Sequence, residues 1–558
     1  NQPEPVPDPV SLAKSPIMPS LISINSRGEL VVGEAARANV DREGMGVREV
    51  KRLMGTGNKV VLGGKEYRPE EISALILRQL KENVETVYGM TVRDVVLSVP
   101  ANFPDAARQA TKDAGELAGL NILRLINEPT AAALAFGLKH LEVEEQLVVF
   151  DFGGGTLDIT IMEMMSGVLD VKSSYGDPRL GGKDFDELLM GLISDKFLRH
   201  NKGLPIADKQ RRQLKGAAET AKIMLSTQKD HQVFIPNFAV SGSGDPVDLE
   251  VDLTRAEFEN AMGSLLGRTR ACIQQALIAK DIRPSAINRV LLVGGTTYIP
   301  IVRQVVAELF GKEPSVDVHP DLAVSMGAAI EAAILNGQID SSESIVRTDV
   351  SPFGIGVETV EDVGMHQMLV YDPLIMPNTT IPYSTNTLYS LLPEDQSEVE
   401  FRVYQDNTGK AKFPQQAIDI GLSGEIVNVP PSFTGTPHEV EVEFSYDVNG
   451  IIKLFAMIPA TGQHVEITRD ITPFRLSEGE KSTALVNVND LWKMNPRAKS
   501  HESIIHKAIS LLEHLPPMKR TQLHQKIEHL KFSIERGDDR TIQTASDDLV
   551  DFLFALEN

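Results

Sequence analysis

The pattern of apolar and polar positions changes twice along the chain. Up to about residue 340, short apolar runs alternate with stretches of helical periodicity. Val95 to Pro100 is typical of a buried strand, and residues 182–198 and 211–225 repeat apolar positions at the spacing of a helix. This alternation predicts an α/β domain.

A strict alternation of period two begins near Val350. Val399, Phe401 and Val403 alternate with charged residues, and a second run of this kind covers residues 439–446. Asn449-Gly450 follows that run and is a strong hairpin signal. The pattern predicts a separate antiparallel β domain over residues 350–475.

Helical periodicity returns after about residue 500. The apolar positions that fall on one helix face are Leu523, Ile527, Leu530 and Ile534. Pro516-Pro517 and Gly537-Asp538 divide this region into about three helices. We expect a small helical bundle or lid.

Three consecutive glycines follow the apolar run at residues 147–150. The segment is Asp151-Phe152-Gly153-Gly154-Gly155-Thr156-Leu157-Asp158. Glycines let a backbone turn tightly and aim its N–H groups at an anion. The carboxylates suit a hydrated Mg²⁺, and the threonine hydroxyl can reach a phosphate oxygen. The segment therefore predicts a nucleotide phosphate loop, although a hairpin turn can carry the same glycines.

A second apolar strand also ends in glycines. Residues 289–293 run into Gly294-Gly295-Thr296-Thr297. Two such units, far apart in the sequence, indicate a duplicated domain that holds a ligand between its halves.

Composition narrows the class of protein. The chain has 558 residues, enough for about three or four domains, with 42% apolar and 24% charged residues. A net charge of -22 argues against nucleic acid or an anionic membrane as the main partner. We expect no membrane span and no leader peptide. The single cysteine, Cys272, excludes an internal disulfide and suits a reducing compartment, so we expect a cytoplasmic protein.

Several long motifs occur in a fixed order. They are Lys51-Arg52-Leu53-Met54-Gly55, VPANFPDAARQATKDAG from Val99, INEPTAAALAFG from Ile126, DFGGGTLD from Asp151, LGGKDFD from Leu180, LVGGTT from Leu292 and NTTIP from Asn378. With these motifs, the chain resembles the heat shock protein 70 (DnaK-type) chaperone family over essentially its whole length.

The resemblance implies a multidomain fold. An α/β ATPase domain of the actin-like type, which is ribonuclease H-like and duplicated, would occupy residues 1–340, and its first strands would be missing. An interdomain linker at 341–349, an antiparallel β-sandwich that binds peptides at 350–475 and an α-helical lid at 476–558 would follow. The linker is more polar than is usual in the family, and the lid is short.

The resemblance also implies a site for ATP or ADP with Mg²⁺ and K⁺. Lys51 would position the attacking water, Glu128, Asp151 and Asp158 would hold the metal and its water shell, and Thr156 would meet the γ-phosphate. The nucleotide contacts implied are Gly153, Gly154, Gly155, Gly181, Gly182, Glu219, Lys222, Ser226, Gly294, Gly295, Tyr298 and Asp321.

Two departures from the family affect this site. Tyr298 stands where the family commonly has an arginine packed on the adenine; an aromatic ring can still stack on a base, with altered affinity or base preference. The family's first phosphate loop would lie before Asn1. We expect that the loop is absent from these residues because of truncation. The alternative is a naturally defective ATPase.

Peptide and cochaperone contacts follow from the same resemblance. Val357, Tyr389, Val399 and Phe401 would line a pocket for an apolar side chain, and Val360 and Leu392 would form an arch over the peptide. For Val357 and Phe401, an ordinary sandwich core explains the pattern equally well. Residues matching J-domain contacts or the relay to the linker are Pro100, Arg108, Arg124, Asn127 and Asp349.

The function implied is an ATP-driven chaperone for unfolded client polypeptides, with a J-domain cochaperone and a nucleotide exchange factor as further partners. A peptide-binding module with a degenerate or nucleotide-sensing ATPase domain is the alternative. A sugar or metabolite kinase on the same fold is less favoured, since a kinase has no use for a peptide-binding sandwich.

Overall fold

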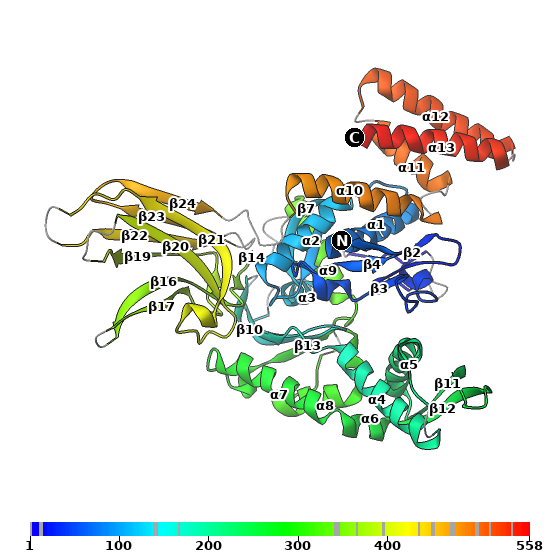
Figure 1. Cartoon of the computed structure of the whole chain (residues 1–558), viewed down its shortest axis with the longest axis horizontal. Helices are drawn as coiled ribbons and strands as arrows, with labels where there is room; N and C mark the ends of the chain where they lie inside the picture. Colours follow the sequence, from blue (N-terminus) through cyan, green and yellow to red (C-terminus); the bar gives the residue numbers. More distant parts are fainter. Residues whose placement is uncertain are drawn as a thin grey trace. The chain divides into compact units, whose positions relative to one another are not determined.

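Figure 1 presents the computed structural model of the chain. It describes residues 3–9, 15–137, 140, 143–165, 168–201, 204–315, 317–339, 346–363, 366–392, 397–432, 436–447, 452–468, 476–496, 501–512, 515–536 and 539–557. The chain forms two compact units. Unit 1 comprises 1–3, 96–109 and 124–475, and unit 2 comprises 4–95, 110–123 and 476–558.

Unit 2 joins the N-terminal strands to the C-terminal helices. Its elements are β1 (Leu21–Ile24), β2 (Leu30–Val32), η1 (Gly33–Ala36), β3 (Gly46–Arg48), η2 (Val50–Leu53), β4 (Val60–Leu62), β5 (Lys65–Tyr67), α1 (Pro69–Tyr88), α10 (Glu478–Lys493), α11 (His501–Leu512), α12 (Pro517–Arg536) and α13 (Asp539–Glu557). Among the described residues, these strands form an antiparallel sheet in the order β2-β1-β3 and an antiparallel pair, β4-β5.

Helix α10 packs against α1 within unit 2 (Figure 1). Its N-terminus is capped by Ser477, whose hydroxyl accepts a hydrogen bond from the backbone N–H of Glu480. Trp492 is buried in the same core as Ile72 and Leu75 of α1. Its indole N–H donates to Glu82 at 3.0 Å, and the guanidinium carbon of Arg78 lies 5.4 Å from the ring centroid.

Unit 1 contains the α/β part predicted from the alternating pattern. Its helices and strands up to residue 350 are α3 (Glu128–Gly137), β8 (Glu145–Phe152), β9 (Leu157–Met165), β10 (Val168–Asp177), α4 (Gly182–His200), α5 (Asp208–Thr227), β11 (Asp230–Val240), β12 (Pro246–Thr254), α6 (Arg255–Ala261), α7 (Gly263–Ile278), η3 (Pro284–Ala286), β13 (Arg289–Val293), η4 (Gly295–Tyr298), α8 (Pro300–Phe310), α9 (Ala323–Leu335), β14 (Val346–Arg347) and β15 (Asp349–Val350). The helices predicted at 182–198 and 211–225 are confirmed as α4 and α5.

Three elements are shared between the units: β6 (Asp94–Val99), α2 (Asp105–Leu117) and β7 (Asn121–Asn127). The strand predicted from Val95 to Pro100 is present as β6, but the prediction that it is buried was wrong for most of it. Only Val99 at its end is buried, and Pro100 lies outside it.

A five-stranded sheet in the order β13-β8-β9-β10-β14 forms the centre of the α/β part. β8 and β13 run parallel, so both strands end at the same edge of the sheet. Phe150 and Phe152 are fully buried in the large core that α4, α5, α7 and α8 complete. Residues 346–347 of the predicted linker form β14, which pairs with β10, and residues 341–345 lie outside the described residues.

Two antiparallel sheets confirm the predicted β region. The elements of this region are β16 (Gly354–Val363), β17 (His366–Ile375), β18 (Thr380–Ile381), β19 (Tyr383–Ser390), β20 (Glu398–Asp406), η5 (Pro414–Gln416), β21 (Ile418–Val427), β22 (Glu439–Tyr446), β23 (Ile452–Ile458) and β24 (Gln463–Thr468). The short strand β18 pairs with β15 and not with either of these sheets. The orders are β17-β16-β20-β21 and β19-β22-β23-β24, and both sheets contribute to one core.

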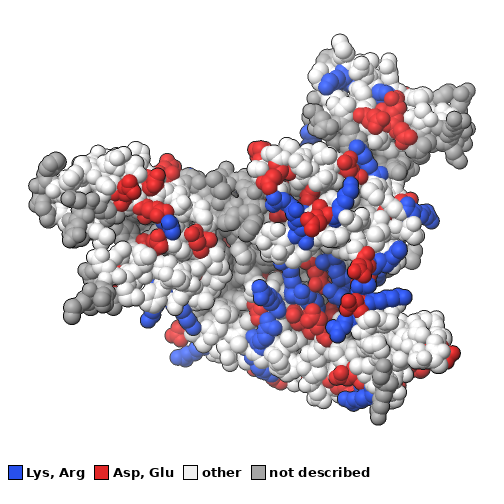
Figure 2. All heavy atoms as spheres, in the orientation of Figure 1, with Lys and Arg blue, Asp and Glu red and all other residues white. Residues whose placement is uncertain are grey.

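The period-two pattern is explained by this arrangement. Val399, Phe401 and Val403 point into the shared core, whereas Glu398 and Glu400 are exposed. Figure 2 shows acidic side chains gathered over these sheets, at the left of the view. Asn449-Gly450 lies outside the described residues, but β22 and β23 pair as the predicted hairpin requires.

The helices α11, α12 and α13 confirm the three predicted after residue 500. Leu523, Ile527 and Leu530 are buried together with Leu549 and Leu553 of α13. Gly537-Asp538 and the side chain of Ile534 lie outside the described residues. None of the helices in the described part of the chain is both long and apolar enough to cross a membrane.

Candidate functional site

The first glycine turn joins two strands that carry carboxylates at their ends. Asp151 of β8 and Asp158 of β9 are register partners, and both are buried. Between them, the backbone N–H of Gly153 donates to the carbonyl of Thr156 at 3.1 Å. Two carboxylates at one glycine turn suit a bound cation, because a cation between them offsets the repulsion of their like charges.

The second glycine turn lies directly beside the first. Val293 of β13 pairs with Asp151 of β8, and the hydroxyl of Thr296 donates to the carbonyl of Gly153 at 2.8 Å. Gly294 has φ +84°, and a Cβ there would lie 2.5 Å from the carbonyl oxygen of Phe152. Only glycine fits this position.

This arrangement corrects one sequence prediction. The two glycine turns were expected in the two halves of a duplicated domain, with the ligand between them. They instead follow neighbouring parallel strands of one sheet and contact each other. The carboxyl ends of adjacent parallel strands form the edge at which α/β sheets commonly bind ligands.

A third glycine segment is hydrogen-bonded to the first. The backbone N–H groups of Gly182 and Lys183 donate to the carbonyls of Gly153 and Gly154 at 3.0 and 3.1 Å. A Cβ on Gly181 would lie 2.5 Å from the backbone nitrogen of Gly155. We call residues 153–155, 181–182 and 294–295 the glycine cluster. Since α4 begins at Gly182, the N-terminal end of its dipole also lies at this cluster.

Helix α5 contributes the polar residues predicted to contact adenosine. The ammonium of Lys222 lies 2.8 Å from the carboxylate of Asp186 and donates to the carbonyl of Gly182 at 3.1 Å. Ser226 donates to the carbonyl of Lys222 at 2.8 Å, and Glu219 is half-buried on the same helix. The structure therefore brings Lys222 to the glycine cluster. Sequence reasoning missed Asp186, although the LGGKDFD motif contains it.

Tyr298 ends η4, just after the second glycine turn. Its hydroxyl donates to the carboxylate of Asp321 at 3.1 Å, and the guanidinium carbon of Arg303 lies 5.7 Å from its ring centroid. Burial, followed by the charge of Asp321, raises the pKa of the Tyr298 hydroxyl. Tyr298 and Asp321, both predicted site residues, are thus brought together, while Arg303 was not foreseen.

Lys51 and Glu128 lie on other elements. Lys51 is exposed on η2 of unit 2, and Glu128 is half-buried at the start of α3 in unit 1. Their roles stay predictions.

The predicted peptide-site residues lie on the two antiparallel sheets. Val357, Val399 and Phe401 are buried in the shared core, whereas Val360 and Leu392 are exposed. Tyr389 is partly buried, and its hydroxyl donates to the carboxylate of Asp372 at 2.6 Å. Burial also raises the pKa of this hydroxyl above its usual range. Whether these residues bind peptide stays a prediction.

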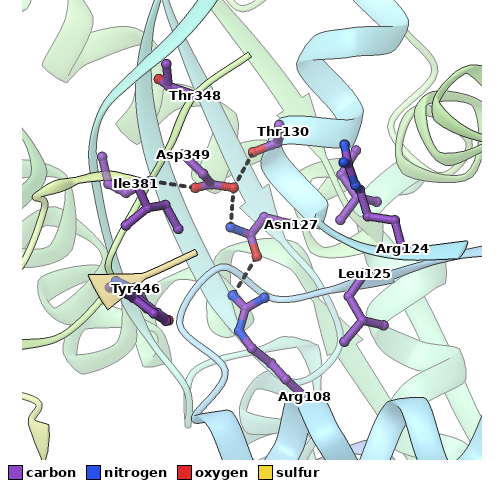
Figure 3. Close-up of a pocket in the computed structure, with 12 residues that line it drawn as sticks. Arg108, Arg124, Leu125, Asn127, Thr130, Thr348, Asp349, Ile381 and Tyr446 are labelled. Carbon is purple, nitrogen blue, oxygen red and sulfur yellow. Dashed lines mark hydrogen bonds between the residues drawn. The ribbon is translucent and has the colours of Figure 1, made fainter. Parts of the chain in front are cut away.

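A pocket of about 60 Å³ contains four of the five predicted cochaperone and relay residues (Figure 3). The amide of Asn127 donates to Asp349 at 2.6 Å, and Arg108 donates to the amide oxygen of Asn127 at 2.6 Å. Thr130 donates to the same carboxylate of Asp349 at 3.4 Å. Asp349 keeps part of its surface exposed, but its carboxylate is enclosed, and this burial raises its pKa.

Arg124 lines the same pocket and forms an ion pair with a residue that the sequence did not single out. Its guanidinium lies 2.7 Å from the carboxylate of Glu331, which is fully buried on α9. The fifth predicted residue, Pro100, is buried in the loop before α2, where its carbonyl accepts from the backbone N–H of Phe103.

Comparison with known proteins agrees with these motifs. Residues 13–553 match the family model described as Hsp70 protein. The chain is 37% identical to the "Chaperone protein DnaK" of Thermotoga petrophila and to that of Thermotoga maritima, over 96% of this chain and 90% of each relative. It is 36% identical to the protein of the same name from Thermosipho melanesiensis, over 95% of this chain and 89% of that relative.

Both the family model and these relatives extend over nearly the whole chain, so the match is not confined to one domain. The chain therefore belongs to the Hsp70 family, and it is an ATP-dependent molecular chaperone with ATPase activity.

Proposed function

We propose that ATP binds at the glycine cluster and that its hydrolysis controls peptide binding by the two antiparallel sheets. The observation that carries this proposal is the meeting of three glycine segments at the ends of β8 and β13, through main-chain hydrogen bonds and the hydroxyl of Thr296. The positive N-terminal end of the α4 dipole would attract the phosphates. Lys222, Ser226, Glu219 and Asp321 would surround the nucleoside.

Phosphoryl transfer depends on positioning and charge neutralisation more than on a covalent nucleophile. Thr156 would donate to a γ-phosphate oxygen, and Lys51 would orient the attacking water. The hydroxyl of Thr156 and the ammonium of Lys51 can both donate hydrogen bonds, as the positioning of phosphate and water requires.

Asp151, Asp158 and Glu128 would hold Mg²⁺, largely through water. The described residues contain no group of three or more His, Cys, Asp or Glu side chains arranged to hold a metal directly. Two buried carboxylates fit a Mg²⁺ that keeps several waters and binds nucleotide phosphates. When bound, the ion would neutralise phosphate charge. K⁺ is proposed from the family alone.

We also propose how the chain is divided into domains. Residues 1–340, from both units, would be the actin-like ATPase domain, the two sheets the peptide-binding sandwich at 350–475, and α10–α13 the lid at 476–558, with 341–349 as the linker. Val357, Tyr389, Val399 and Phe401 would line the peptide pocket, with Val360 and Leu392 as its arch.

The proposed partners are unfolded client polypeptides, a J-domain cochaperone that meets Arg124, Asn127 and Asp349, and a nucleotide exchange factor. Pro100 and Arg108 would relay the nucleotide state to the linker. Neither nucleic acid nor membrane is proposed as a partner, and the proposed location is the cytoplasm.

Single-turnover ATP hydrolysis by the full-length protein, with and without an apolar peptide, tests the proposal. We expect Thr156→Ala and Lys51→Ala to lower turnover by orders of magnitude while peptide binding persists. Thr220→Ala, which changes an exposed threonine of α5, is the matched control and should retain turnover. Unchanged turnover in both site variants would refute the site. A wild-type protein that binds peptide without hydrolysing ATP would favour a peptide-binding module, which the family match does not support.

A further inference from the structure

Asn102 has a side-chain amide that is shielded from solvent. It lies in the loop between β6 and α2, and neither its Oδ1 nor its Nδ2 has a hydrogen-bond partner among the residues that the structure describes. Asparagine side chains in loops usually bond to nearby backbone groups. Because an enclosed polar atom without a partner is costly, the Asn102 amide marks a place where a ligand or its water can bind.

The amide of Asn102 lies beside Asp158, a carboxylate of the proposed Mg²⁺ site. Gly176 of β10 is the register partner of Asp158. A Cβ on Gly176 would lie 2.8 Å from Nδ2 of Asn102 and 2.8 Å from Oδ1 of Asp158. The two side chains therefore border the same small space, which glycine at position 176 does not fill.

The loop that carries Asn102 is held on both sides of this residue. The guanidinium of Arg108 donates to the carbonyl of Ala101 at 3.1 Å and to that of Phe103 at 3.3 Å. Ala101 and Phe103 are both buried. The same guanidinium donates to Asn127 (Figure 3). Since its neighbours in the chain are anchored, Asn102 presents its amide beside Asp158 from a fixed backbone.

We propose that Asn102 is a positioning residue of the Mg²⁺ site, and that it holds a water of the ion's hydration shell together with Asp158. This inference rests on the proposed nucleotide site. Mg²⁺ keeps several waters when it binds nucleotide phosphates, and an amide oxygen can accept a hydrogen bond from such a water. Groups that support a metal in this way change its affinity by about 10- to 100-fold when they are removed.

ADP binding in Mg²⁺ and in EDTA tests the inference. Calorimetric titration of ADP into the full-length protein gives an affinity in each condition, and the ratio of the two measures the contribution of Mg²⁺. We expect Asn102→Leu, which removes both polar atoms, to lower this ratio about tenfold or more and to leave the affinity in EDTA unchanged. A merely structural role would weaken ADP binding in both conditions. Asn102→Asp keeps an acceptor oxygen and should retain most of the ratio.

Hydrolysis gives a second readout. The Mg²⁺ concentration that supports half-maximal single-turnover ATP hydrolysis should rise in Asn102→Leu by a factor similar to the loss of the ratio. Asn386→Leu is the matched control, because Asn386 is exposed on β19, and it should leave both affinities unchanged. Circular dichroism establishes that each variant is folded.

Two results would overturn the inference. One is a wild-type ratio in Asn102→Leu, and the other is an equal loss in Asn102→Leu and Asn102→Asp, since the acceptor oxygen would then not matter. Asp158→Asn separates this inference from the proposed function. If Asp158→Asn also keeps the wild-type ratio, the proposed Mg²⁺ site fails, whereas a loss in Asp158→Asn alone excludes only Asn102.

Discussion

The glycine cluster and the core of the two antiparallel sheets are stabilised in opposite ways. In the cluster, main chain contacts main chain, and a side chain at Gly181 or Gly294 would overlap backbone atoms. In the sheet core, Val442, Phe444 and Leu454 fill the interior with side chains that have no exposed surface. The cluster is therefore sensitive to added atoms, and the core to removed ones.

The largest effect should come from one added methyl group in the cluster. Gly294→Ala places a Cβ 2.5 Å from the carbonyl oxygen of Phe152, at a φ of +84° that alanine disfavours. Because the turn must shift, we expect single-turnover ATP hydrolysis to fall about a hundredfold or more. Gly191→Ala is the control: nothing lies within 4 Å of the added Cβ inside α4, so turnover should persist. Similar turnover in the two variants would contradict the comparison.

Removal of a side chain should be the costly change in the sheet core. Phe444→Ala is expected to lower the free energy of unfolding of the sheets by about 3–5 kcal/mol, since a fully buried ring leaves a cavity. Leu388→Ala, at an exposed position of β19, should cost much less. Urea denaturation followed by circular dichroism measures both. Equal losses would show that burial does not govern this region.

The ion pair between Arg124 and Glu331 is a third kind of contact, which joins two side chains of opposite charge. Arg124→Leu leaves the fully buried carboxylate of Glu331 without its guanidinium partner, and we expect a loss of about 1–3 kcal/mol of stability. The double variant Arg124→Leu/Glu331→Leu should recover much of this loss. A double variant that is no more stable than Arg124→Leu would contradict the view that the buried carboxylate left without its guanidinium causes the loss.

The smallest effect expected is on the pH dependence of stability. Burial raises the pKa of Asp349, and Arg108, Asn127 and Thr130 oppose this shift. Between the ordinary aspartate value, about 3.9, and the raised pKa, the folded state binds more protons than the unfolded one. Stability should therefore fall as pH rises through this window, by less than about 1.4 kcal/mol per pH unit. Denaturation at several pH values should show that Asp349→Asn lacks this slope; an identical slope would exclude Asp349 as its source.

Local patterns predicted most of the elements. Alternating Val399, Phe401 and Val403 defined β20, and the apolar run at 147–150 followed by glycines defined the first turn. These signals are carried by neighbouring residues, so they can be recognised in the sequence. The parallel pairing of β8 with β13 depends on residues far apart in the chain. The expectation that the two glycine turns lie in separate halves failed for this reason.

Side-chain partners were the least predictable part of the site. The family resemblance implied Lys222 and Tyr298 as site residues, but not the choice of Asp186 and Asp321 as their partners. A carboxylate in a sequence can pair with any nearby cation, and only the fold decides which one. The packing of α10 on α1 was equally hidden, because more than half of the chain separates these helices.

The position of Trp492 allows the packing of α10 on α1 to be followed by intrinsic fluorescence. It is the only tryptophan in the chain, and it is buried between α10 and α1, where Glu82 accepts from its indole N–H. Indole fluorescence moves to longer wavelength when the ring enters water. The emission of the unlabelled protein therefore reports whether α10 is seated on α1, and stopped-flow mixing with nucleotide or peptide can time any separation without an added dye.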